Sequence, residues 1–160
     1  MKKTVLLLPA LLFFSIMVFS QEVTQDKVPL PVRQAFEKKF PAATDIKYEL
    51  EKKNYEVSFK DKEAEMSASF SSTGKWLETE TKITESDLPK KVMKSVAKNF
   101  KGYMMSGLAT VETPSVKLCY EMDVKNDKQG YEVLISHKGD ILRKTPLKKE
   151  KPGKPENDKK

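Results

Sequence analysis

The sequence predicts an α+β fold built from two tandem units, each a helix packed on one face of a roughly four-stranded antiparallel sheet. Two observations predict it. Apolar residues recur twice at helical spacing, and each time the following segments alternate between apolar and polar residues. The two stretches also match each other position by position. The length of 160 residues suits one compact domain or two small packed halves.

Residues 1–20 have the pattern of a secretory signal peptide. Lys2 and Lys3 precede an uncharged apolar run, and the small residue Ser20 precedes Gln21. A transmembrane anchor is the alternative, but the run is short and no basic cluster follows it. We expect cleavage between Ser20 and Gln21, a periplasmic or secreted protein, and no stable membrane insertion after the signal is removed.

An internal repeat organises the rest of the chain. Val28, Val32, Phe36 and Phe40 match Leu88, Val92, Val96 and Phe100 at a constant offset, and Tyr55, Val57, Phe70, Gly74 and Leu77 match Tyr120, Met122, Ile135, Gly139 and Leu142 at a larger one. The change of offset predicts an insertion within residues 102–119. The expected organisation is a linker at 21–27, repeats at 28–84 and 85–147, and a disordered basic tail at 148–160.

Each repeat is expected to begin with a helix. The first apolar stripe ends before Pro41, which cannot continue a helix. In the second repeat Pro89 suits a first turn, and Ser86 or Asp87 is the expected cap. The solvent face of this second helix carries lysines.

Each repeat then turns to period two, which is typical of strands with one buried face. Tyr55, Val57 and Phe59 alternate with Glu56, Ser58 and Lys60, and a turn at 72–74 leads into a further strand at 76–83. The second repeat has the same alternation and a turn at 138–140. An antiparallel meander is therefore expected in each repeat.

The order of these segments resembles the PepSY-like, beta-lactamase-inhibitor-like proteins, a family of small exported proteins of Gram-negative bacteria. The resemblance covers about residues 27–145 and rests on VPLPVRQAFEKKFP, NYEVSF and STGKWLETE in the first repeat, and on LPKKVMKSVAKNFKGY and QGYEVLISHKGDILRK in the second. It implies two helix-plus-sheet units side by side, similar to the β-lactamase inhibitor protein, and a non-enzymatic binding or inhibitory role. It does not identify a target.

The formal net charge of +7 would suggest nucleic-acid binding if the positive charge lay in the folded part of the chain. The leader contributes +2 and the tail +3, so the folded part is nearly neutral. The tail could adhere to an anionic membrane or cell-wall polymer, or simply solubilise the protein. Nucleic-acid binding is not expected.

The sheet face turned away from the helices is expected to be polar and net acidic. The candidate binding residues on it are Glu56, Glu65, Glu78, Glu80, Glu121 and Glu132. The face is either a solvated surface or a platform for a protein partner.

Two aromatic residues complete the candidate set. Trp76 points outward beside Glu78 if Leu77 points to the core, and otherwise Trp76 is itself a core residue. Tyr103, with Met104 and Met105, is either a contact loop or part of the core.

Catalytic chemistry has no support in the sequence. The single histidine, His137, precedes a predicted turn, and the single cysteine, Cys119, lies in a strand, either exposed or inert and half-buried. No catalytic residues, metal ligands or cofactor are predicted. The preferred function is an exported binding module that contacts a protein through the open sheet face, including inhibition of an envelope enzyme as one form. The alternatives are a small-ligand carrier that uses a cleft near Trp76, Tyr103 and Met104, and an enzyme.

Overall fold

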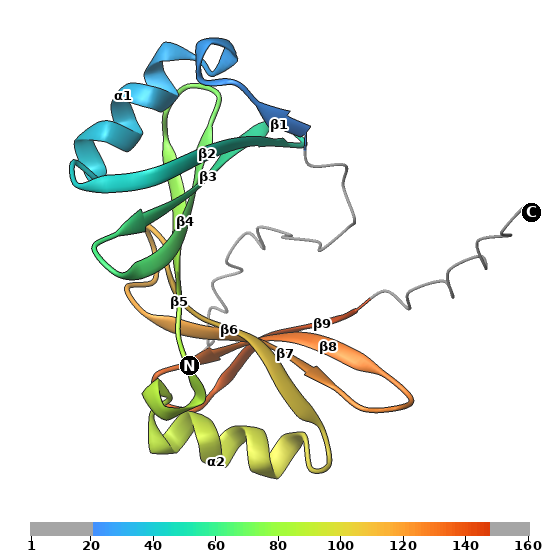
Figure 1. Cartoon of the computed structure of the whole chain (residues 1–160). Helices are drawn as coiled ribbons and strands as arrows, with labels where there is room; N and C mark the ends of the chain where they lie inside the picture. Colours follow the sequence, from blue (N-terminus) through green and yellow to red (C-terminus); the bar gives the residue numbers. More distant parts are fainter. Residues whose placement is uncertain (1–20, 148–160) are drawn as a thin grey trace, which may run out of the picture.

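A computed structural model describes residues 21–147 and shows an α+β fold with two helices and one antiparallel sheet (Figure 1). The elements are β1 (Gln21–Val23), η1 (Gln25–Lys27), α1 (Leu30–Lys39), β2 (Ala43–Glu51), β3 (Asn54–Asp61), β4 (Ala64–Ser71), β5 (Trp76–Lys82), η2 (Glu85–Asp87), α2 (Lys90–Asn99), β6 (Met104–Glu112), β7 (Cys119–Lys125), β8 (Gly130–Ser136) and β9 (Ile141–Pro146). The predicted signal peptide and basic tail lie outside the described residues.

All nine strands form a single meander in the order of the chain. The sequence predicts a separate sheet in each repeat, but this prediction is wrong, because β5 pairs with β6 and makes the sheet continuous. The expected linker at 21–27 contains β1, which pairs with β2 and becomes one edge of the sheet. Two residues join β2 to β3, but residues 113–118 join β6 to β7, and this longer loop lies within the interval predicted for the insertion.

The helices cover two separate apolar cores. In the first core, Phe36 of α1 meets Phe59 edge to face at 5.0 Å between ring centroids, and it also contacts Phe40, Tyr48 and Phe70. In the second core, Val92 and Val96 of α2 pack on Met122 and other apolar side chains of β7 and β8. The stripes at helical spacing predict both helices, because burying these residues stabilises them.

The start of α2 differs from the expected one. Thr84 and Asp87 form a capping box on η2, in which the Asp87 carboxylate accepts hydrogen bonds from the Thr84 amide and hydroxyl at 2.9 and 2.7 Å. The residue that precedes α2 is Pro89, which provides no side-chain cap.

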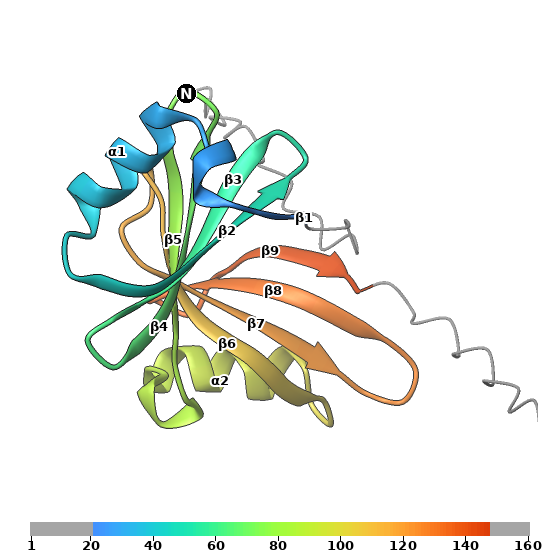
Figure 2. The same ribbon diagram turned by 45° about the horizontal axis from the view of Figure 1, so that its top comes forward.

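Both helices lie on the same face of the sheet. Thr81 of β5 pairs with Met66 of β4, which packs against the first core. Thr81 also pairs with Thr110 of β6, and Thr110 pairs with Tyr120 of the second core. Paired residues point to the same side of a sheet, so both cores lie on one face. The helices are far apart along the sheet, so they lie at opposite ends of the molecule (Figures 1 and 2). Among the described residues no helix covers the other face, which we name the open face.

Candidate functional site

Carboxylates from both halves of the chain meet on the open face. This carboxylate cluster consists of Glu56 on β3, Glu78 and Glu80 on β5, Glu121 on β7 and Glu132 on β8. Register explains the placement, because Ser69 of β4 pairs with Glu56 on one side and Glu78 on the other. Strand alternation then keeps Glu80 on the same face as Glu78.

Arg143 of β9 forms ion pairs with two carboxylates of this cluster. Its Nη2 donates to Glu121 Oε2 at 2.7 Å and to Glu132 Oε1 at 3.0 Å. Glu132 is only 6% exposed. A buried carboxylate of this kind requires a partner, because an unpaired charge away from water is costly.

Burial raises the pKa values of several members of the cluster. The pKa of Glu78 rises to about 7, chiefly through burial and then through the charge of Glu121, although Arg143 opposes the rise. The pKa of Glu80 also rises to about 7, through burial and then the charge of Glu78. Burial, with Glu80 and Glu132 beside it, raises the pKa of Glu121 to about 8. Burial raises the pKa of Glu56 as well, and a hydrogen bond with Ser67 opposes the rise.

These shifts have two consequences for chemistry at the open face. Near neutral pH the cluster holds some of its protons, because like charges in a partly dry site disfavour full ionisation. A cation brought to the face from outside would favour the ionised form. The cluster is therefore suited to receive positive charge.

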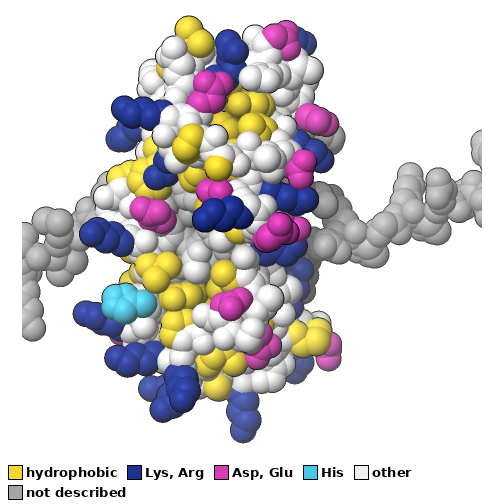
Figure 3. All heavy atoms as spheres, turned by 60° about the vertical axis from the view of Figure 1, so that its left-hand side comes forward, with side chains coloured by type: hydrophobic (Ala, Val, Ile, Leu, Met, Phe, Trp, Pro, Cys, Tyr) yellow, Lys and Arg dark blue, Asp and Glu magenta, His cyan; other side chains and the backbone are white. Residues whose placement is uncertain are grey.

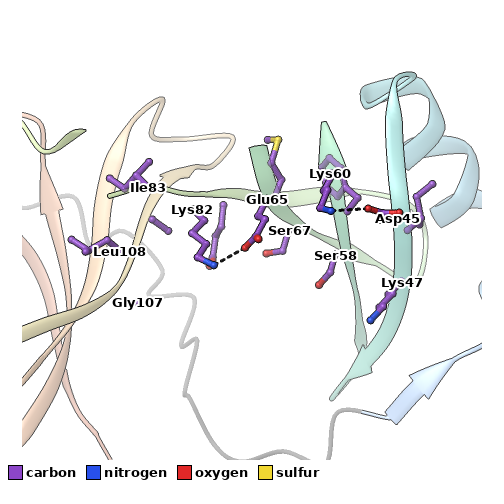
Figure 4. A pocket seen from close by; sticks show the side chains of 15 residues that line it. Asp45, Lys47, Ser58, Lys60, Glu65, Ser67, Lys82, Ile83, Gly107 and Leu108 are labelled. Atoms are coloured by element: carbon purple, nitrogen blue, oxygen red, sulfur yellow. Dashed lines mark hydrogen bonds and ion pairs between the residues drawn. The ribbon is translucent and has the colours of Figure 1, made fainter. Parts of the chain in front are cut away.

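A groove of about 1010 Å³ lies beside the cluster, across the strands that join the two halves. Figure 4 shows side chains from β2, β3, β4, β5 and β6 around it. Lys82 pairs with Glu65 at 2.6 Å, and Lys60 pairs with Asp45 at 2.9 Å. Both pairs are exposed, so they add little to stability. Apolar side chains also line the groove: Ile46, Met66, Ile83 and Leu108.

The comparisons with known proteins decide the family. A family model described as "Putative beta-lactamase-inhibitor-like, PepSY-like" matches residues 17–69 and 53–143, which together span most of the chain. The chain belongs to this PepSY-like family. A search of curated proteins found no match.

Solved structures share the fold of this PepSY-like protein. A putative periplasmic protein from Bacteroides eggerthii is 22% identical with a TM-score of 0.67, over 74% of this chain and 88% of the other. A BLIP-like protein from Bacteroides fragilis is 20% identical with a TM-score of 0.66, over 76% and 88%. At these identities the similarity extends to the fold alone.

Five of the eight candidate residues form the carboxylate cluster of the PepSY-like chain. Glu65 lies on the same face, but it is exposed and pairs with Lys82 at the groove. Arg143 is not among the residues predicted from the sequence. A signal for it exists in the sequence, because Arg143 follows Glu78 at the same offset that separates Gly74 from Gly139.

Trp76 is not on the open face. A bulge between Ser69 and Phe70 shifts the register of β5, so that Trp76 pairs with Phe70 and packs against the first core. Its Nε1–H donates to Thr79 Oγ1 at 2.9 Å, and Lys39 Nζ lies 3.8 Å from its ring centroid. The reading with Leu77 in the core and Trp76 beside Glu78 is therefore wrong.

Tyr103 also lies away from the carboxylate cluster. It packs on Phe100 and Tyr131 at the edge of the second core, and Gln129 donates a hydrogen bond to its hydroxyl. Met104 is 75% exposed, and neither it nor Tyr103 or Trp76 lines the groove. Trp76 packs on the first core and Tyr103 on the second, so these residues do not come together as the walls of one cleft.

The remaining reactive side chains are Cys119 and His137, and Cys119 shares the open face with Glu121, two residues further along β7. Cys119 is buried beside Val111 and Ser136, and burial raises the pKa of its thiol. His137 is exposed next to the turn before β9. Within residues 21–147 no three or more His, Cys, Asp or Glu side chains are arranged to hold a metal ion, and no helix there has both the length and the apolar character of a membrane span.

Proposed function

We propose that this protein is an exported, non-enzymatic binding module whose open face contacts a protein partner. The observation that carries the proposal is the uncovered sheet face, which holds the carboxylate cluster and contributes Lys60, Ser67 and Glu80 to the wall of the groove. Sheet faces without a covering layer are suited to flat protein contacts, and buried polar groups in a contact require complementary partners.

Charge complementarity specifies the partner's chemistry. Glu78, Glu80 and Glu121 repel one another and retain protons near neutral pH. A lysine or arginine side chain from a partner would relieve this repulsion and form charge-assisted hydrogen bonds. Inhibition of an envelope enzyme is one form of the proposed function, in which a basic loop of the enzyme enters the open face.

The proposed location is the periplasm, after removal of residues 1–20. The leader pattern supports it, as does the fold shared with a Bacteroides eggerthii protein described as a putative periplasmic protein. We also infer that the chain is a tandem duplication, with repeats at 28–84 and 85–147. The equivalent turns support this, since Gly74 approaches Pro31 of α1 and Gly139 approaches Lys91 of α2.

The binding proposal is tested by capture of partners from the envelope fraction with matched variants. Glu78→Lys combined with Glu80→Lys reverses charge on the open face, whereas Glu63→Lys combined with Glu85→Lys makes the same change at exposed sites elsewhere. We expect at least one envelope protein that the parent and the control variant both capture and that the open-face variant does not capture. Equal capture by all three proteins would contradict the proposal.

A small-ligand carrier is the second candidate, and the groove favours it. Apolar side chains and Lys60 and Lys82 would suit an amphipathic molecule with a negative group. Native mass spectrometry of protein recovered from the periplasm would show a bound mass that is lost with Leu108→Asp. A spectrum of the unliganded chain alone, after recovery without dialysis, would contradict this candidate.

A further inference from the structure

The outer face of α2 carries a concentration of positive charge that the fold does not use. The exposed lysines are Lys90, Lys91, Lys94, Lys98 and, directly after the helix, Lys101. The helix contains no acidic residue, and no ion pair is resolved for these lysines within the described chain. Figure 3 shows lysine and arginine side chains gathered at the lower end of the molecule, where Figure 1 places α2.

The arrangement of these lysines has an energetic cost for the helix. Lys90, Lys94 and Lys98 are spaced four residues apart, and like charges at this spacing destabilise a helix. Lys90 and Lys91 lie in the first turn, where the helix dipole disfavours cations. Stability of the fold therefore does not explain the pattern.

Comparison of the two helices within the chain supports the same conclusion. At the offset that aligns the cores, Lys90, Lys91 and Lys94 correspond to Leu30, Pro31 and Gln34 of α1. The helix α1 packs on its core without a lysine at any of these three positions. The excess positive charge is larger on α2, which has four lysines and no acidic residue, than on α1, which has three basic residues and Glu37.

We propose that the lysine face of α2 docks on the surface of an anionic phospholipid bilayer. Three of the lysines extend along one side of the helix over about 12 Å, at 1.5 Å per residue. Because α2 lies at one end of the molecule, all three can contact a flat bilayer surface at once. The apolar stripe of α2 is buried in the second core, so the contact is electrostatic and the helix does not insert. The exposed face has no aromatic side chain, whereas nucleic-acid surfaces commonly use such side chains for stacking.

Docking through α2 leaves the binding surface accessible. Both helices lie on one face of the sheet, and the carboxylate cluster lies on the other. An anionic bilayer would attract α2 and repel the cluster. The membrane would therefore orient the open face toward the aqueous compartment, an inference that goes beyond the proposed partner binding and does not depend on it.

Vesicle co-sedimentation tests the proposal. The probes are vesicles of phosphatidylcholine with about one third phosphatidylglycerol, and binding to pure phosphatidylcholine is subtracted. Because each lysine near an anionic surface contributes roughly fivefold in affinity, Lys90→Gln, Lys94→Gln and Lys98→Gln together should weaken binding by about a hundredfold. Glutamine has nearly the helix propensity of lysine, so the fold should be retained, and circular dichroism checks this.

The matched control removes the same charge elsewhere. Lys53→Gln, Lys75→Gln and Lys128→Gln change three exposed lysines outside α2, and we expect a loss of less than tenfold. Added salt should abolish binding of the parent, because the contact is screened. The proposal would be overturned if the parent did not bind the vesicles, or if both variants lost binding equally. It would also be overturned if the α2 variant lost binding to an acidic protein or an oligonucleotide but kept binding to vesicles.

Discussion

Replacement of Glu80 by glutamine tests the electrostatics of the open face in depth. Glu80 lies in the carboxylate cluster, where burial and the neighbouring charge of Glu78 raise its pKa from 4.5 to about 7. Glutamine keeps the shape of the side chain and resembles the protonated acid. The variant therefore removes the cost of ionisation and little else.

The sign of the effect follows from proton linkage. Between pH 4.5 and about 7 the folded protein holds a proton at Glu80 that the unfolded chain has released, so stability falls as pH rises through this window. The full shift corresponds to about 3 kcal/mol at 1.36 kcal/mol per unit. Because the side chain is only partly buried, we expect about 1–3 kcal/mol after allowance for solvent screening.

Urea unfolding at pH 4.5 and pH 8 measures this effect. At pH 8 Glu80→Gln should be more stable than the parent, with a midpoint higher by roughly 1 M, and at pH 4.5 the two proteins should agree. Exposed Glu63→Gln serves as the control and should change neither midpoint. A Glu80→Gln protein that is less stable than the parent at pH 8 would refute the reasoning.

Three further predictions concern the packing of the fold that positions the site. Gly74→Ala should destabilise the protein by about 2–4 kcal/mol in urea unfolding, because its φ is +79° and a Cβ there would lie 2.4 Å from the Pro31 carbonyl oxygen. Gly102 has a similar φ but lies in open space, so Gly102→Ala should cost only about 1 kcal/mol. Equal costs for the two variants would contradict the predicted clash with Pro31. Phe36→Ala should cost about 3–5 kcal/mol, since the ring fills the centre of the first core, and a loss below 1 kcal/mol would disprove that packing. The thiol of Cys119 should react with a chromogenic disulfide at least tenfold more slowly in the folded protein than in urea, and equal rates would show that it is exposed.

The periodic parts of the fold could be predicted from the sequence. Val32 and Phe36 lie at helical spacing, and the alternation of Tyr55 and Glu56 assigns the two faces of β3, so both the core and the acidic face follow from local patterns. Six members of the predicted binding set do share one face, namely the five residues of the carboxylate cluster and Glu65. Such patterns are informative because burial of an apolar face determines both period and register.

The parts that the sequence did not predict depend on how the strands pair, and not on the periodicity of a single segment. The sequence left two orientations of Trp76 open, and a bulge opposite Phe70 places this side chain against the first core; no local pattern marks which residue a bulge adds. Continuity of the sheet depends on pairs between β5 and β6, such as Glu80 with Val111, across the whole of α2. The raised pKa values also could not be predicted, because they require the burial of Glu121 beside charges from other strands.

Site-specific photo-cross-linking in exporting cells tests the central claim most directly. A photoreactive amino acid at Lys47 or Ser67, which line the groove beside the carboxylate cluster, should form a covalent adduct with a partner protein. The same amino acid at the exposed positions Gln34 of α1 and Ala97 of α2 should not form that adduct. Adducts that form only from the two helix positions, or equally from all four, would contradict the assignment of the open face as the binding surface.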